Sequence, residues 1–348
     1  MEITFLLGNG FDIGLKMKTR YEDFYKDYCK IKKDDNENIQ AFKNMLAHRN
    51  EEKAKKIIDW ADFEKAFGEH SVDFSLSTKL AYIERFEHFV RTFNEYLENE
   101  EMHVDYSKSE RIAKTMKNAI THFYHIRPED REWLSRFISG FGGPHTYNFV
   151  SFNYTKCVDR CVEETKAFYI EDNSFKIGTV MHVHGYIEDS MIMGVNDASQ
   201  ITQEELANDP DVQKRLIKPK QNSIGKTLYD SKMESVINRS TVICVYGMSI
   251  GDTDAKWWHR ISQWLAANDR RALVILKHDS AYNQRFIFSQ SDIVDSITDR
   301  FLSFSKLKED EKGKIMGRIF VGVNHDIFSI PLRIDQIVFE SKALQSMT

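Results

Sequence analysis

The sequence contains few cysteines, few prolines and no long apolar run. Its 348 residues include four cysteines, of which none forms a C-x-x-C pair, and Cys157 and Cys161 share one helical face. Such spacing is typical of buried thiols in a reducing compartment. No apolar stretch approaches the roughly 20 residues that a membrane-spanning helix needs. Gly8 and Asp12 interrupt the only early apolar run, so no signal peptide is expected. We therefore expect a cytoplasmic protein without membrane segments.

The chain also lacks an excess of positive charge. It has 48 lysines and arginines against 53 aspartates and glutamates, a formal net charge of −5. This balance argues against broad, sequence-independent binding of nucleic acid and leaves open a local basic patch. With only five prolines, long disordered linkers are not expected, and the length suits one large domain or two of ordinary size.

The most informative segment present is the N-terminal one. Residues 2–7 have strand character and end abruptly at Gly8-Asn9-Gly10. Glycines allow a tight turn and close approach of a ligand, and a helix beginning near Phe11 would direct free N–H groups at an anion. The spacing to Gly14 is one residue longer than the dehydrogenase fingerprint, and residues 28–37 are too charged to form its second buried strand. The sequence thus predicts a nucleotide-binding α/β protein other than an ordinary dehydrogenase. The alternative is a glycine turn that serves only the fold.

Two patterns divide the chain. Residues 19–140 show helical spacing, most clearly in the segments 54–67 and 80–97, and a glycine-rich break follows at residues 140–144. Beyond the break, short apolar segments predict strands at 147–152, 180–184, 191–194, 241–246, 272–276 and 319–323. Strands separated by helix-length connections favour a parallel sheet covered by helices. We expect a mainly parallel, Rossmann-like α/β core formed by residues 1–18 and 141–348, with residues 19–140 as a helical insertion or cap.

Four polar clusters follow predicted strands, where ligands bind in open α/β sheets. The first, residues 8–12, ends in Asp12, which either caps a helix or binds a ribose diol. The second, residues 151–155, contains Asn153, whose amide both donates and accepts hydrogen bonds and so suits a ribose, an amide or a water. An asparagine at a strand end is also a common turn residue.

The third cluster holds His182 and His184 on one side of a strand, with Gly185 leaving space beside His184. A neutral imidazole there suits a general base. A metal pair is the weaker alternative, because no third ligand is apparent nearby. The fourth cluster, residues 245–254, precedes a predicted helix at 256–265. Its small residues allow a sugar or phosphate to approach closely, and its carboxylates suit a helix cap or hydroxyl groups.

Taken in order, these residues resemble a known family. The segments 8–12, 60–64 and 152–155, the pair His184-Gly185, and Gly247-x-Ser249 with its two following aspartates resemble the AbiH family of bacterial abortive-infection, anti-phage proteins. The resemblance covers nearly the whole chain. The layout is more distantly similar to SIR2-like NAD-binding domains, which have a glycine-rich first turn, an Asn, a His-Gly and a Gly-x-Ser in this order.

The SIR2 resemblance implies a role for each cluster. Asn153 and His184 match the residues that act at the nicotinamide ribose. The resemblance implies that Gly8, Gly10 and Phe11 lie at the phosphate and ribose, and that Gly247 and Ser249 meet the adenosine side. The other candidate nucleotide-binding residues are Asn9, Tyr154, Thr155, Asp252 and Asp254. The chain departs from the sirtuin turn at Asn9 and Asp12 and lacks the four-cysteine zinc ribbon. Protein deacylation is therefore disfavoured, and no metal is expected.

The resulting hypothesis is an anti-phage effector that hydrolyses the nicotinamide–ribose bond of NAD or a related nucleotide. His184 would act as base, Asn153 would orient ribose and water, and Asp12 would stabilise developing positive charge. NAD is then the substrate, and no further cofactor is required. Two alternatives remain: a nucleotide-binding sensor whose helical region contacts a phage or host protein, and a nuclease-like toxin that acts on RNA. Homo-oligomerisation is left open.

Overall fold

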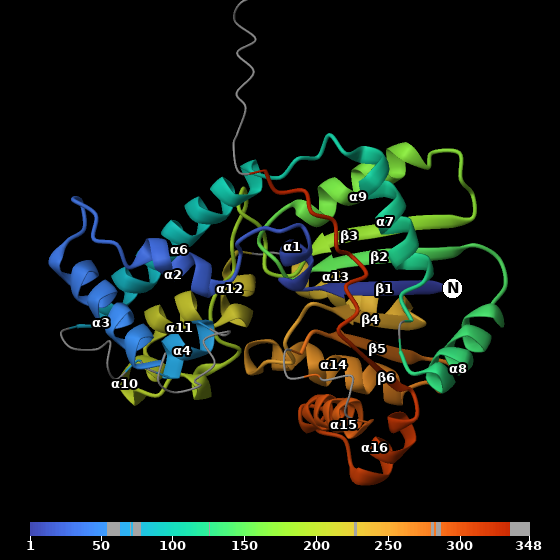
Figure 1. The fold of residues 1–348 in the computed structure, drawn as a ribbon. Helices are drawn as coiled ribbons and strands as arrows, with labels where there is room; N and C mark the ends of the chain where they lie inside the picture. The colour runs from blue at the N-terminus through green and yellow to red at the C-terminus, as the bar shows by residue number, and fades with distance from the viewer. Residues whose placement is uncertain are drawn as a thin grey trace, which may run out of the picture.

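A six-stranded, entirely parallel sheet forms the centre of the protein (Figure 1). The computed structural model describes residues 1–53, 63–69, 71, 78–124, 126–225, 228–279, 282 and 287–334. The strands are β1 (Glu2–Leu7), β2 (His145–Ser151), β3 (Phe175–His182), β4 (Val242–Tyr246), β5 (Ala272–Lys277) and β6 (Ile319–Val323). Their order is β3-β2-β1-β4-β5-β6, the order of Rossmann-like sheets. The strand order reverses between β1 and β4, which is where such sheets bind ligands.

Helices cover both faces of this sheet, which explains why its strands are almost entirely apolar. In β1, Ile3, Phe5 and Leu7 belong to the core on one face, and Leu6 belongs to the core on the other. The helices on the first face are α7 (Ser109–Thr121), α8 (Pro128–Ser139) and α9 (Cys157–Phe168). Those on the second face are α13 (Tyr229–Arg239), α14 (Ala255–Ala266), α15 (Ile287–Ser303) and α16 (Glu309–Met316).

A second group of helices lies beside the carboxyl ends of the strands (Figure 1). We call it the helical body. It consists of α2 (Tyr21–Tyr28), α3 (Glu37–Lys53), α4 (Phe63–Glu69), α6 (Lys79–Met102), α10 (Glu204–Asn208), α11 (Pro210–Leu216) and α12 (Lys218–Ile224). The aromatic stripe of α6, including Phe86, Phe89 and Phe93, fills its core. The remaining short helix, α1 (Gly10–Gly14), follows β1 directly.

The predicted parallel sheet is confirmed, and most predicted strands fall on observed ones. Helix 80–97 lies within α6, and helix 256–265 lies within α14. Of helix 54–67, residues 63–67 begin α4, and 54–62 lie outside the described residues. Within the segment 19–140, α2, α3, α4 and α6 pack in the helical body, whereas α7 and α8 pack on the sheet.

The strand predicted at 191–194 is wrong. This segment is coil, bounded by Gly185 and Gly194 with φ of +68° and +142°. The turn at Gly185 separates it from β3, and Met193 is buried in the core of the helical body. The Ile192 N–H donates to the carbonyl of His184 at 2.8 Å instead of joining a strand. The run is apolar because it fills a core between helices.

Candidate functional site

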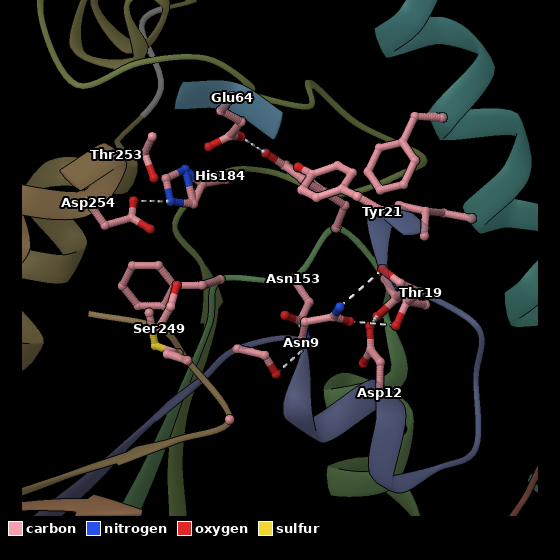
Figure 2. A pocket seen from close by; sticks show the side chains of 18 of the residues that line it. Asn9, Asp12, Thr19, Tyr21, Glu64, Asn153, His184, Ser249, Thr253 and Asp254 are labelled. Carbon is pink, nitrogen blue, oxygen red and sulfur yellow. Dashed lines mark hydrogen bonds and ion pairs between the residues drawn. The ribbon is translucent and has the colours of Figure 1, made fainter. Parts of the chain in front are cut away.

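A cavity lies at the carboxyl ends of β1 to β4, between the sheet and the helical body (Figure 2). The turn after each of these four strands contributes to its lining, and α4, α6 and α12 close it from the other side. Its lining includes Gly8, Asn9, Asp12, Thr19, Glu64, Phe152, Asn153, Tyr154, Thr155, His184, Lys218, Gly247, Ser249 and Asp254. Segments more than 200 residues apart in the sequence therefore form one site.

The turns after β1 and β4 touch through their backbones. The Gly10 N–H donates to the Gly247 carbonyl at 2.9 Å, and a Cβ on Gly10 would lie 2.4 Å from the Gly247 Cα. Gly247 has φ of +65°, which favours glycine. The Asn9 amide donates to the Thr19 carbonyl at 3.0 Å, and its oxygen accepts from the Thr19 hydroxyl. Asn9 thus fixes the glycine turn to the chain that follows α1.

Asp12 lies beside the cavity with its carboxyl group removed from water. It is 1% exposed, and its Oδ2 accepts a hydrogen bond from the Thr155 hydroxyl at 2.8 Å. Among the described residues, the buried Oδ1 has no hydrogen-bond partner. Burial raises the pKa of Asp12 to about 7. The carboxyl group can therefore change its protonation state near neutral pH.

Asn153 is held in place from two directions. Its side-chain Nδ2 donates to the Gly8 carbonyl at 3.0 Å, which ties the turn after β2 to the glycine turn after β1. Its own carbonyl lies 3.1 Å from Nδ1 of His182. Nε2 of His182 lies 2.6 Å from Asp159 Oδ2. His182 is absent from the cavity lining, so it supports Asn153 from behind.

His184 lines the cavity in a buried position. Its ring lies 5.5 Å from that of Phe152, and its Nε2 lies 3.0 Å from Asp254 Oδ1 without the alignment of a hydrogen bond. Burial, together with the positive charge of Lys218, lowers the pKa of His184 to about 3. The imidazole is therefore neutral at physiological pH and able to accept a proton.

Buried charges connect His184 to the helical body. Lys218 Nζ lies 2.7 Å from Glu64 Oε2 and 3.4 Å from Asp254 Oδ1. The Tyr154 hydroxyl donates to Glu64 Oε1 at 2.8 Å, and burial raises the pKa of this phenol. Glu64 and Lys218 come from α4 and α12, so the helical body supplies ionised groups to a site that otherwise consists of strand-end turns.

A family model described as Bacteriophage abortive infection AbiH matches residues 4–276. The chain belongs to the AbiH family. The match includes the turns after β1, β2, β3 and β4, and therefore every sheet-derived part of the cavity. No curated protein and no solved structure gives a significant match. Family membership indicates a role in bacteriophage abortive infection.

Most residues of this AbiH sequence that were assigned to catalysis or nucleotide binding line the same cavity, and Gly10, Phe11 and Asp252 do not. Gly10 lies in the backbone contact with Gly247. Phe11 packs in the core beside the sheet, where its ring lies 5.4 Å from that of Phe328. The Asp252 carboxylate pairs with Lys65 and, at 3.0 Å, with Arg300, outside this cavity. No described helix is long and apolar enough to cross a membrane.

Sequence reasoning missed Lys218 and gave Glu64 no role. Glu64 belongs to the 60–64 segment by which the chain resembles AbiH proteins, and this was the available signal. Lys218 carries no local signal, because it is a single lysine before a proline among 48 basic residues. Only the packing of α12 against the strand ends shows that it lies in the site.

Proposed function

We propose that this AbiH protein is an anti-phage effector that binds NAD or a related nucleotide in the cavity and hydrolyses its nicotinamide–ribose bond. One observation carries the proposal. Asn153 and a buried, uncharged His184 line a single cavity with the glycine turn, at the point where the strand order reverses. Ligands of doubly wound sheets bind at this position. The order of these residues, which resembles that of SIR2-like domains, supports NAD as the nucleotide.

The charge of the cavity favours the nicotinamide riboside end of such a ligand. Among the described residues, three carboxyl groups line it, those of Asp12, Glu64 and Asp254, against one lysine, Lys218. Carboxylates repel phosphate, but they accept hydrogen bonds from ribose hydroxyls and attract a cationic pyridinium ring. As the bond breaks, the positive charge moves to the ribose, and carboxylates placed nearby stabilise it.

The reaction needs a well-placed water and a weak base. The C1′–N bond breaks with its electron pair going to the nicotinamide nitrogen, and a water oxygen forms the new bond to C1′. The attacking water then carries a positive charge and is strongly acidic, so the weakly basic imidazole of His184 suffices to accept its proton. With NAD as the substrate, the products are nicotinamide, ADP-ribose and one proton. Asn153 orients ribose and water, and Asp12 faces the developing charge.

Nicotinamide release from NAD tests this proposal. Purified protein, alone and with extract from phage-infected cells, is incubated with NAD, and free nicotinamide is measured by chromatography. We expect release by the wild type and a loss of about 10²–10⁴-fold in His184→Ala and Asn153→Ala, because a positioned acid–base group contributes that much. The matched control is His122→Ala, because His122 is exposed and lies outside the cavity. Thermal melts of each variant separate lost chemistry from lost folding.

Two other outcomes would contradict hydrolysis. If the protein binds NAD without cleaving it and still stops phage, the protein is a nucleotide sensor. A protein that kills cells, releases no nicotinamide and cleaves tRNA or mRNA would be a nuclease-like toxin. The acidic cavity disfavours the second, because RNA is a polyanion.

A further inference from the structure

The two ring nitrogens of His184 have different surroundings. Nε2 lies 3.0 Å from Asp254 Oδ1, and a dashed line marks this contact in Figure 2. Nδ1 is buried and has no hydrogen-bond partner among the described residues. A carboxylate only accepts hydrogen bonds, so a neutral imidazole is most stable beside it with its single proton on Nε2. Hydrogen bonds of catalytic groups are often poorly aligned until substrate binds, and the Nε2–Asp254 contact fits that description.

Asp254 is held by its charge partner. It ends the 3₁₀ turn at Asp252–Asp254 and occupies the N-cap position of α14, yet its side chain caps no helical N–H. Its Oδ1 lies instead between His184 Nε2 and Lys218 Nζ, at 3.0 Å and 3.4 Å. Lys218 is fixed in turn by its 2.7 Å ion pair with Glu64. The Asp254 side chain is partly buried, with 19% of its surface exposed, and its contacts with His184 and Lys218 offset the cost of removing the rest of its carboxylate from water.

We propose that Lys218 and Asp254 are positioning residues that keep the proton of His184 on Nε2, so that Nδ1 is the atom that accepts a proton in the reaction. The lysine fixes the carboxylate, and the carboxylate fixes the tautomer and orientation of the imidazole. Lys218 comes from α12, whereas His184 follows strand β3 of the sheet. The orientation of His184 therefore depends on the helical body. This inference rests on the proposed hydrolysis for its kinetic consequence, but its structural claim holds without it.

The electrostatic surroundings of His184 agree with this arrangement. The charged and titratable groups that act on it are Lys218 from α12, Asp254 before α14 and His182 at the end of β3. Glu64 from α4 acts through Lys218, and Tyr154 lies with its ring 6.4 Å away. Of these charges, Lys218 opposes protonation of the imidazole and Asp254 favours it.

The tautomer can be observed directly, without any assay of activity. Protein labelled with ¹⁵N-histidine is examined by long-range ¹H–¹⁵N correlation spectra, and His184 is assigned by its loss in His184→Gln. We expect the Nε2–H tautomer in the wild type and an upfield shift of the Nε2 proton in Asp254→Ala, which lacks the carboxylate. A wild-type spectrum with the proton on Nδ1, or a resonance that Asp254→Ala leaves unchanged, would overturn the inference.

Lys218→Met tests whether the lysine positions Asp254. A double variant controls for misfolding caused by a buried Glu64 that has lost its charge partner. The single change leaves Glu64 with one fewer partner, so Lys218→Met/Glu64→Gln removes both charges at nearly constant shape. Both are expected to move the His184 Nε2–H resonance. The control Lys117→Met breaks a lysine–aspartate pair with Asp172, far from this cavity, and is expected to leave the resonance in place. Equal spectra for Lys218→Met, the double variant and wild type would overturn the role of the lysine.

The kinetic consequence is tested on nicotinamide release. Asp254→Ala is expected to lower kcat by about 10²-fold or more, as loss of an orienting carboxylate does elsewhere. Lys218→Met is expected to raise the pH at which the acidic limb of the kcat/KM profile falls, because the imidazole then protonates more readily, and Lys218→Arg restores the profile. If the wild-type protein releases no nicotinamide, the proposed function is refuted. The NMR spectra then still decide whether Asp254 and Lys218 fix the tautomer of His184. An active wild type with an unshifted profile in Lys218→Met would refute this inference alone.

Discussion

The buried carboxyl group of Asp12 makes the free energy of unfolding depend on pH, and Asp12→Asn removes this contribution. Burial raises the pKa of Asp12 from 3.8 to about 7. Between these values the folded protein retains a proton that the unfolded chain releases, so stability falls as the pH rises through this window. Above pH 7 the folded state also holds an ionised carboxylate, in a buried position, so the stability does not fall further through this group. Asp12→Asn lacks this pH dependence.

The magnitude follows from the pKa shift. Each pH unit between the two pKa values corresponds to about 1.36 kcal/mol, and the slope declines as the pH approaches 7, so between pH 5 and pH 7 the wild type loses about 2 kcal/mol relative to Asp12→Asn. Urea unfolding of both proteins at pH 5, 6, 7 and 8 measures how the difference between their unfolding free energies changes with pH. The substitution also alters the hydrogen bond with Thr155, but a constant effect of that kind does not contribute to the change with pH. Asp34→Asn, at an exposed position, is the control and is expected to follow the wild type. A stability difference that stays flat with pH, or grows toward pH 5 in favour of Asp12→Asn, would refute the reasoning.

Three further predictions concern the construction of the site. Gly10→Ala places a Cβ 2.4 Å from the Gly247 Cα and is expected to cost about 1–3 kcal/mol or more in urea unfolding, whereas Gly313→Ala, in open space within α16, is expected to stabilise the protein by about 0.5–1 kcal/mol. Equal effects of the two changes would show that the glycine contact is not tight. Tyr154→Phe removes the hydroxyl that donates to Glu64 and is expected to cost about 1–3 kcal/mol, with unchanged stability as the opposing result. His182→Ala is expected to reduce nicotinamide release less than His184→Ala in protein of equal thermal stability, because only His184 lines the cavity; the reverse order would contradict these roles.

The sheet and much of the site were predictable because both depend on short-range patterns. Strands buried on two faces are continuously apolar, and the carboxyl ends of parallel strands meet at one edge. Polar residues directly after such strands, like Asn153 and His184, therefore converge even when they are distant in the sequence. The same rule does not indicate which side of a turn each residue faces. Phe11 and Asp12 are neighbours in α1, about 100° apart around the helix axis, so one faces the core and the other the cavity.

Features that depend on packing between distant segments could not be predicted. Residues 191–194 are apolar like a strand, and periodicity alone does not distinguish a short buried strand from a coil that fills a helical core. Lys218 looks like any other lysine until α12 is placed against the strand ends. The ion pairs that join it to Glu64 and Asp254 bring together three segments of the chain, none of which shows a motif for that contact.

The central claim is that the cavity at the carboxyl ends of β1 to β4 binds NAD by its nicotinamide riboside end. A crystal structure of His184→Ala soaked with NAD tests this most directly, because the variant is expected to bind the dinucleotide without cleaving it. The account predicts density for ribose and nicotinamide beside Asn153, with ribose hydroxyls within hydrogen-bond distance of cavity carboxylates. NAD bound elsewhere on the protein, or no density at NAD concentrations that saturate binding in solution, would contradict it.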